Sequence, residues 1–146
     1  MQATDAQIRQ ILKQVQTIAC VGFSHKSERP SHSVSGFLVA QGYTVIPVNP
    51  GLEGRRFLGQ TVRARLADLT RPVDMIDVFR RPEALPALVD EVLAMAVRPK
   101  VLWTQLGVVH PGALQRARAA GMDVVADRCP AIEIPRLFPG GLPGAA

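Results

Sequence analysis

The chain has little of what would indicate a secreted, membrane-spanning or nucleic-acid-binding protein. Its two cysteines, Cys20 and Cys129, are too few for a disulfide framework and are typical of a reducing compartment. No apolar run approaches the roughly 20 residues of a membrane span, and the polar N-terminus lacks the apolar core of a signal peptide. Only 5% of residues are aromatic, without the basic interleaving of a base-stacking surface. We therefore expect a cytoplasmic protein that binds neither membranes nor nucleic acid.

Catalytic and metal-binding patterns are also missing. The three histidines, His25, His32 and His110, do not have the spacing of a metal site, and no Ser-His-Asp arrangement can be assembled. Cys129 follows the last apolar run, but a reactive thiol needs a neighbouring group that lowers its pKa, and the sequence places none there. We expect an inert or half-buried thiol, no metal and no catalytic residue, so that binding is the function to look for.

What is present is the composition of one globular domain. The chain has 146 residues, of which 47% are hydrophobic and 20% charged. The net charge is +5, and its cations are spread over several short segments instead of one run. Such a balance suits an anionic ligand, or a solvated basic surface with no partner. We expect one domain over residues 1–138 and a flexible Gly/Pro-rich tail over residues 139–146.

Strand-like and helix-like segments alternate along the chain. Short apolar runs predict strands over residues 17–23, 43–48, 73–79, 100–105 and 122–127, separated mostly by segments with helical spacing. A capping box at Thr4 and Gln7 begins a leading helix over residues 4–15. We expect an α/β fold, a doubly wound parallel five-stranded sheet with helices on both faces and strand order 3-2-1-4-5. Residues 52–62 are expected to form a loop, and residues 128–138 receive no assignment.

Ligands of doubly wound sheets bind beyond the carboxyl ends of the strands, so the residues after each strand are the candidates. The first strand is followed by Gly22, Phe23, Ser24, His25 and Lys26, with Arg29 leading into a helix. Backbone N–H groups, a hydroxyl and two cationic side chains at a helix N-terminus suit a phosphate. The alternative is a polar connection with one turn glycine. The loop lacks the G-x-G-x-x-G pattern of a dinucleotide site.

The later strand ends carry further candidates. An NAD site has a carboxylate after the second strand, whereas this chain has Val48, Asn49 and Pro50. Further on, Arg55 and Arg56 can meet a ribose phosphate of NADP or CoA, or form a solvated pair. After the third strand, Phe79 is either an adenine contact or the last core residue, and Arg80 can face phosphate. Gly107 allows a tight turn after the fourth strand.

Four segments together resemble the small stand-alone CoA-binding proteins of bacteria and archaea. They are "ACVGFSHKSERPSHSVSGFLVAQGYTVIPVNP", "PVDMIDVFRRPE", "VLWTQLGV" and "AAGMDVVADRC", in that order, and cover nearly all of the chain from Thr17 to Cys129. These proteins are similar to the N-terminal CoA-binding domain of the succinyl-CoA synthetase α subunit. The resemblance implies a Rossmann-like fold that binds CoA across the strand ends.

The resemblance also implies roles for individual residues. The loop Gly22 to Lys26 would bind CoA phosphates, and Arg55 or Arg56 would replace a lysine that the synthetase has after its second strand. One further set would border the nucleotide: Val48, Asn49, Pro50, Val78, Phe79 and Arg80. Another set would line the side nearer the pantetheine: Thr104, Gln105, Leu106 and Gly107. The phosphohistidine domain of the synthetase has no counterpart in this chain.

We expect a non-catalytic protein that binds CoA or an acyl-CoA. The alternatives are an NAD(P)-binding redox module, and a regulatory or interaction protein whose nucleotide crevice is a vestige. The sequence identifies no protein partner.

Overall fold

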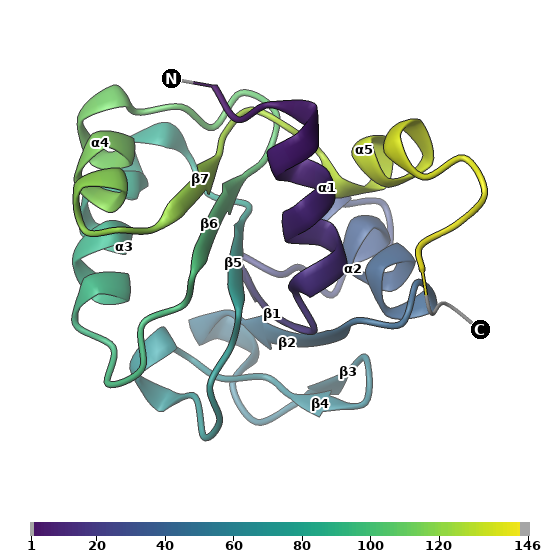
Figure 1. The fold of residues 1–146 in the computed structure, drawn as a ribbon. Coiled ribbons are helices and arrows are strands. Elements are labelled where there is room, and N and C mark those ends of the chain that lie inside the picture. The colour runs from purple at the N-terminus through teal and green to yellow at the C-terminus, as the bar shows by residue number, and fades with distance from the viewer. Residues whose placement is uncertain (1, 144–146) are drawn as a thin grey trace.

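The computed structural model describes residues 2–143 and has a five-stranded parallel sheet at its centre (Figure 1). The five predicted strands all form, as β1 (Thr17–Val21), β2 (Thr44–Val48), β5 (Met75–Val78), β6 (Val101–Thr104) and β7 (Asp123–Val125). Their apolar residues are buried on both faces, as expected of strands covered by helices on either side. The predicted fold class, a doubly wound α/β sheet, is confirmed.

The predicted strand order is wrong. The observed order is β2-β1-β5-β6-β7, or 2-1-3-4-5 when these strands are counted along the chain. The third strand in this count, β5, pairs with β1 directly, instead of lying outside β2 at the sheet edge. Both orders satisfy the right-handed crossover rule, and the hydrophobic pattern of a buried strand does not say which neighbour it pairs with. The switch point therefore lies between β1 and β5.

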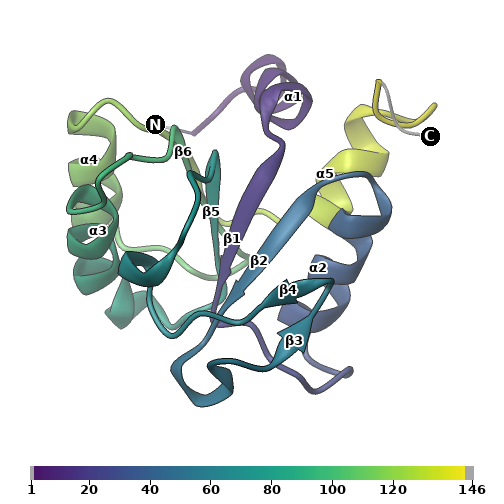
Figure 2. The same cartoon turned by 90° about the horizontal axis from the view of Figure 1, so that it is seen from below.

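Helices cover both faces of the sheet (Figures 1 and 2). One face carries α1 (Asp5–Gln14), α2 (Pro30–Ala40) and α5 (Pro130–Leu137), and the other carries α3 (Leu85–Leu93) and α4 (Pro111–Ala119). Within residues 2–143, every helix falls short of the length and apolar character that a membrane span requires. The helices pack on the two faces of the sheet, and the carboxyl end of each strand continues into a loop.

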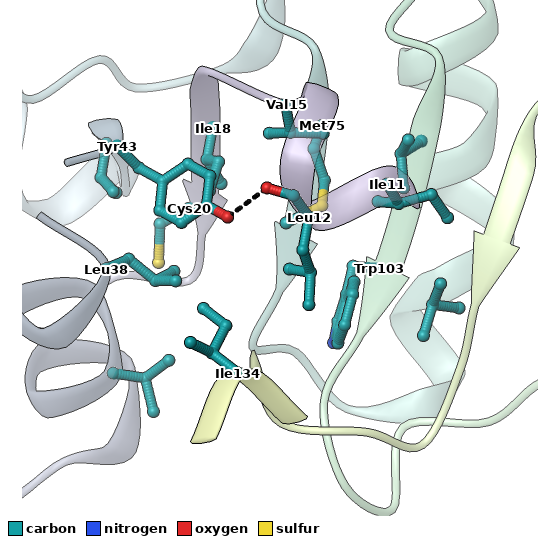
Figure 3. Close-up of a cluster of buried hydrophobic side chains, with 14 of the residues drawn as sticks. Ile11, Leu12, Val15, Ile18, Cys20, Leu38, Tyr43, Met75, Trp103 and Ile134 are labelled. Atoms are coloured by element: carbon teal, nitrogen blue, oxygen red, sulfur yellow. Dashed lines mark hydrogen bonds between the residues drawn. The ribbon is translucent and has the colours of Figure 1, made fainter. Parts of the chain in front are cut away.

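Alternation along the strands divides the core into two clusters. In β5, Met75 belongs to the cluster under α1, α2 and α5, whereas Ile76 and Val78 belong to the cluster under α3 and α4. Figure 3 shows the first cluster, in which the Tyr43 hydroxyl donates a hydrogen bond of 2.5 Å to the carbonyl of Leu12. This bond ties the end of α1 to the start of β2.

Two segments form elements that the sequence analysis did not assign. In the expected loop over residues 52–62, β3 (Arg56–Phe57) and β4 (Gln60–Thr61) make a small antiparallel hairpin. Leu58 and Gly59 both have positive φ, as a two-residue type I′ turn requires, but Leu-Gly lacks the usual Asn-Gly signal. Residues 50–52, 66–68 and 82–84 are short 3₁₀ turns.

The other segment forms α5, which has Pro130 in its first turn and is held to α1 by an ion pair of 2.8 Å between Arg136 and Asp5. The expected flexible tail packs onto the protein at Leu142, which is buried in the first cluster. Residues 144–146 of that tail lie outside the described residues.

Candidate functional site

A hollow with a volume of about 1040 Å³ lies at the switch point. Its walls are the β1–α2 loop, the start of α2, the segments after β5 and β6, and the start of α5. This size reaches the upper end of the roughly 300–1,000 Å³ range of ligand pockets. A cavity at this position is where a doubly wound sheet binds its ligand.

Gly22 brings two strand ends together at the floor of this cavity. Its φ is +88°, and its N–H donates a 3.0 Å hydrogen bond to the carbonyl of Val48. A Cβ atom at this position would lie 2.2 Å from the backbone oxygen of Phe79. Only glycine combines this backbone conformation with such a close approach. The contact between the end of β1 and the segment after β5 therefore requires glycine at this position of the loop.

The β1–α2 loop folds back over the N-terminus of α2. The Ser24 N–H donates to Ser31 Oγ at 2.9 Å, and the Lys26 N–H donates to Ser24 Oγ at 3.2 Å. The N-cap residue Arg29 makes no side-chain capping bond, and Pro30 occupies the first turn. Since Arg29, Pro30 and Ser31 line the cavity, the positive end of the α2 dipole lies at its wall.

The charge around the cavity is strongly positive. Its lining includes four cationic side chains, from Lys26, Arg29, Arg80 and Arg81, against the one carboxylate of Glu83. The four cations belong to exposed residues on two facing segments, the β1–α2 loop and the segment after β5. Cationic side chains with a helix N-terminus make this wall a site for a ligand with several phosphate charges.

A smaller hollow of about 300 Å³ shares Arg80 with the main cavity. Val48 and Pro50, at the end of β2, border it together with apolar residues such as Leu66 and Leu88. Val48 and Pro50, which were predicted to border a nucleotide, therefore line a hollow next to the main cavity. Arg80 lies where the apolar hollow and the cationic cavity meet.

The inner wall of the main cavity is different in character. It contains Gln105 and Cys129, both buried, and the half-buried ring of Phe79. Gln105 Nε2 donates a 2.8 Å hydrogen bond to Oδ1 of Asp77, a fully buried residue of β5. The second oxygen, Asp77 Oδ2, is buried and has no hydrogen-bond partner. Burial raises the pKa of Asp77 to about 7, although the hydrogen bond from Gln105 opposes the shift.

Cys129 is the N-cap residue of α5 and is 8% exposed. Burial raises the pKa of its thiol, and the charges of Asp77 and Glu133 act in the same direction. The backbone N–H groups of Ala131 and Ile132 oppose this shift. The sequence predicts an inert or half-buried thiol, and the structure shows a buried thiol with a raised pKa.

Several predicted site residues serve the fold instead of the cavity surface. Phe23 is fully buried, and its ring stacks on His32 with centroids 5.6 Å apart, so its side chain is a core residue. Val78 is also buried in the core. The Asn49 side chain donates to the Phe23 carbonyl at 2.7 Å and accepts from the Gly51 N–H at 2.8 Å, which ties the loop after β2 to the loop after β1.

The two arginines predicted to meet the ribose phosphate are in the β3–β4 hairpin and not in the cavity lining. The Arg55 guanidinium lies 5.1 Å from the centroid of the Phe57 ring. Arg56 donates to the Gly59 carbonyl at 2.9 Å and to Thr61 Oγ1 at 3.2 Å. The expected loop over residues 52–62 contains a hairpin instead, and this hairpin holds both side chains outside the cavity lining. Exposed His25 also lies outside the lining.

The segment after β6 divides into wall and support. Gln105 and the exposed Leu106 line the cavity. Thr104 is fully buried and donates to the Val108 carbonyl at 2.6 Å, and the Gly107 N–H donates to Asp127 Oδ1 at 2.6 Å. Thr104 and Gly107 therefore shape the loop without lining the cavity.

Sequence reasoning missed Asp77, Arg81 and Ser31. Arg81 directly follows a predicted site residue, and Asp77 is a charged residue inside an apolar strand, so both left a visible signal. Ser31 left none, because its bond to the Ser24 N–H depends on how the loop folds back.

Comparisons with known proteins agree with this geometry. A family model described as a CoA binding domain matches residues 16–135. The Bacillus subtilis (strain 168) protein YneT is 37% identical over 124 residues, which are 85% of this chain and 89% of that protein. The structure of cell-free ID.343 from Thermus thermophilus has a TM-score of 0.88 and 44% identity, covering 93% of this chain and 100% of that one. A hypothetical protein from Pyrococcus horikoshii OT3 has a TM-score of 0.86 and 34% identity, covering 93% of each chain.

Proposed function

The chain belongs to the CoA binding domain family, and from that premise we propose that it binds CoA in the cavity at the switch point. The observation that carries the proposal is the cationic wall: four basic side chains and the N-terminus of α2 face one cavity whose floor requires Gly22. CoA carries a pyrophosphate and a 3′-phosphate, and this wall supplies donors for both. The two free cysteines fit a reducing compartment such as the cytoplasm.

The shapes of the two hollows suggest which end of CoA lies where. The phosphates face Lys26, Arg29 and Arg80, and the adenosine end occupies the smaller hollow beside Pro50. The pantetheine arm then extends along the apolar side of the main cavity toward Gln105 and Cys129. The residues present therefore fit each chemical part of the ligand, and an acyl-CoA would differ only at this inner end.

We propose binding without turnover. Thioester chemistry needs an activated nucleophile, and the thiol that lines the cavity, Cys129, has a raised pKa. The buried Asp77 beside it adds to this shift when it is charged.

CoA should raise the melting temperature much more than NAD does. At a concentration of 100 Kd, ligand linkage contributes about 2.7 kcal/mol, which corresponds to a rise of about 5–10 °C for a chain of this length. A melting series with CoA, acetyl-CoA, NAD, NADP and ATP makes the comparison, and the acetyl-CoA sample should release no free thiol. A larger rise with NAD or NADP would favour a redox module, and no rise with any ligand would favour a vestigial crevice.

Replacing Arg80 with alanine should weaken CoA binding by about ten- to hundredfold, the value of one charge-assisted contact of about 1.5–3 kcal/mol. The matched control is Arg56→Ala, which removes an exposed arginine whose partners lie within its own hairpin. Titration calorimetry with CoA and with dephospho-CoA measures the loss and assigns it to the pyrophosphate or the 3′-phosphate. Equal losses in the two variants would contradict the assignment of the cationic wall.

A further inference from the structure

The inner end of the cavity contains a cysteine where the proposed ligand has its thiol. Cys129 lines the same cavity as the cationic residues, and Gln105 lines it beside the buried carboxyl of Asp77. A CoA molecule whose phosphates face Lys26 and Arg29 has its thiol at the opposite end of its pantetheine arm. This inference therefore rests on the proposed function and concerns the same site.

Asp77 lies behind this wall, because it is fully buried and does not itself line the cavity. In the sheet register it lies beside Cys20 and Trp103, and its side chain shares their face of the sheet, which is also the face of Cys129. Gln105 donates to one carboxyl oxygen, while the other is buried without a partner. Leaving a buried acceptor unsatisfied costs about 1–3 kcal/mol. Gln105, which lines the cavity, is therefore the group through which the Asp77 carboxyl meets this wall.

We propose that Cys129 forms a mixed disulfide with the thiol of CoA when CoA is offered as its disulfide. The Cys129 thiolate attacks one sulfur of the CoA disulfide, and a bond between Cys129 Sγ and that CoA sulfur forms as the original S–S bond breaks. The second CoA leaves as a thiolate and takes up the proton that Cys129 has lost. The CoA disulfide is the oxidant, so the exchange needs no other reactant.

The surroundings make this exchange selective for one cysteine. Cys20 lines none of the cavities described. It is buried within β1 and accepts a hydrogen bond from Ser35 Oγ at 3.3 Å. Burial strongly raises the pKa of the Cys20 thiol. Cys129 is at a cavity wall, and although burial raises the pKa of its thiol, the backbone N–H groups of Ala131 and Ile132 oppose that shift. Binding of the phosphates would hold the CoA sulfur near Cys129 and raise its effective concentration.

The test uses the full chain, freed of reductant at pH 8, with CoA disulfide and with glutathione disulfide at equal concentration. Intact mass should increase by one CoA unit and return to the original value with reductant. The rate should be at least about tenfold higher with CoA disulfide, since only this reagent has phosphates for the cationic wall. Peptide mapping should place the adduct on Cys129, Cys129→Ser should form none, and Cys20→Ser should react like the original chain.

An adduct on Cys20, or equal rates with the two disulfides, would overturn the inference. So would the absence of an adduct when CoA itself raises the melting temperature, and that result would leave the proposed function intact. If CoA neither raises the melting temperature nor forms an adduct, both proposals fail. Acetyl-CoA, which has no disulfide, should form no adduct but should slow the reaction by competing for the cavity.

Discussion

Replacing Gly22 with alanine is expected to lower the free energy of unfolding by about 3 kcal/mol or more and to remove CoA binding. The φ of +88° costs an L-residue roughly 1–2 kcal/mol. The new methyl group would also lie 2.2 Å from the Phe79 oxygen, a backbone atom that cannot move without shifting the end of β5. Relief of such overpacking typically costs a further 1–3 kcal/mol or so.

Gly107→Ala separates the two contributions. Gly107 has a similar φ of +79°, but a Cβ atom there would meet nothing within 4 Å. We therefore expect Gly107→Ala to cost only the conformational 1–2 kcal/mol or so. Urea unfolding of both variants gives the comparison, and a Gly22 variant too unstable to purify would be the extreme of the expected result. Equal decreases in the free energy of unfolding would show that the segment after β5 shifts at little cost to accommodate the methyl group.

The parts of the fold that follow from local pattern could be predicted from the sequence. Each buried strand is a short apolar run, and Thr4 and Gln7 form the predicted capping box. The strand order could not be predicted, because the apolar residues Ile76 and Val78 are expected in β5 both when it pairs with β1 and when it lies at the sheet edge. The hairpin that contains Arg56 depends on two consecutive residues of positive φ, one of them Leu58, which no propensity favours.

The candidate site shows the same division. Ser24, Lys26, Arg29, Phe79 and Arg80 were predicted from their place after a strand, and Gln105 and Leu106 from the resemblance; all of them line the cavity. Phe23 occurs in the same loop as Ser24 but faces the core, since successive residues of a tight loop point in different directions. Arg55 and Arg56 were predicted from their charge and from the resemblance, in which they replace a lysine, and neither fixes the direction of a side chain.

Replacing Asp77 with asparagine is expected to stabilise the protein above neutral pH. The pKa of Asp77 is about 7 in the folded state, against an ordinary value of 3.8, so between these values the folded state holds a proton that the unfolded state has released. The free energy of unfolding contributed by this group therefore falls as the pH rises from about 4 to about 7 and stays low above that. Asparagine keeps the size and an acceptor for Gln105 but cannot become charged.

At pH 8 we expect Asp77→Asn to gain about 2–4 kcal/mol, the size of a shift of roughly three pKa units, and below pH 4 to gain almost nothing. Among the described residues, the thiols of Cys20 and Cys129 are influenced by the charge of this carboxyl, and burial raises the pKa of both, so they stay predominantly protonated through this range. Urea unfolding from pH 4 to pH 8 measures the difference, with the exposed Asp123→Asn as a control that should change stability by less than about 0.5 kcal/mol. A gain that did not depend on pH would mean that Asp77 keeps one protonation state throughout, and its unpartnered oxygen would then need another explanation.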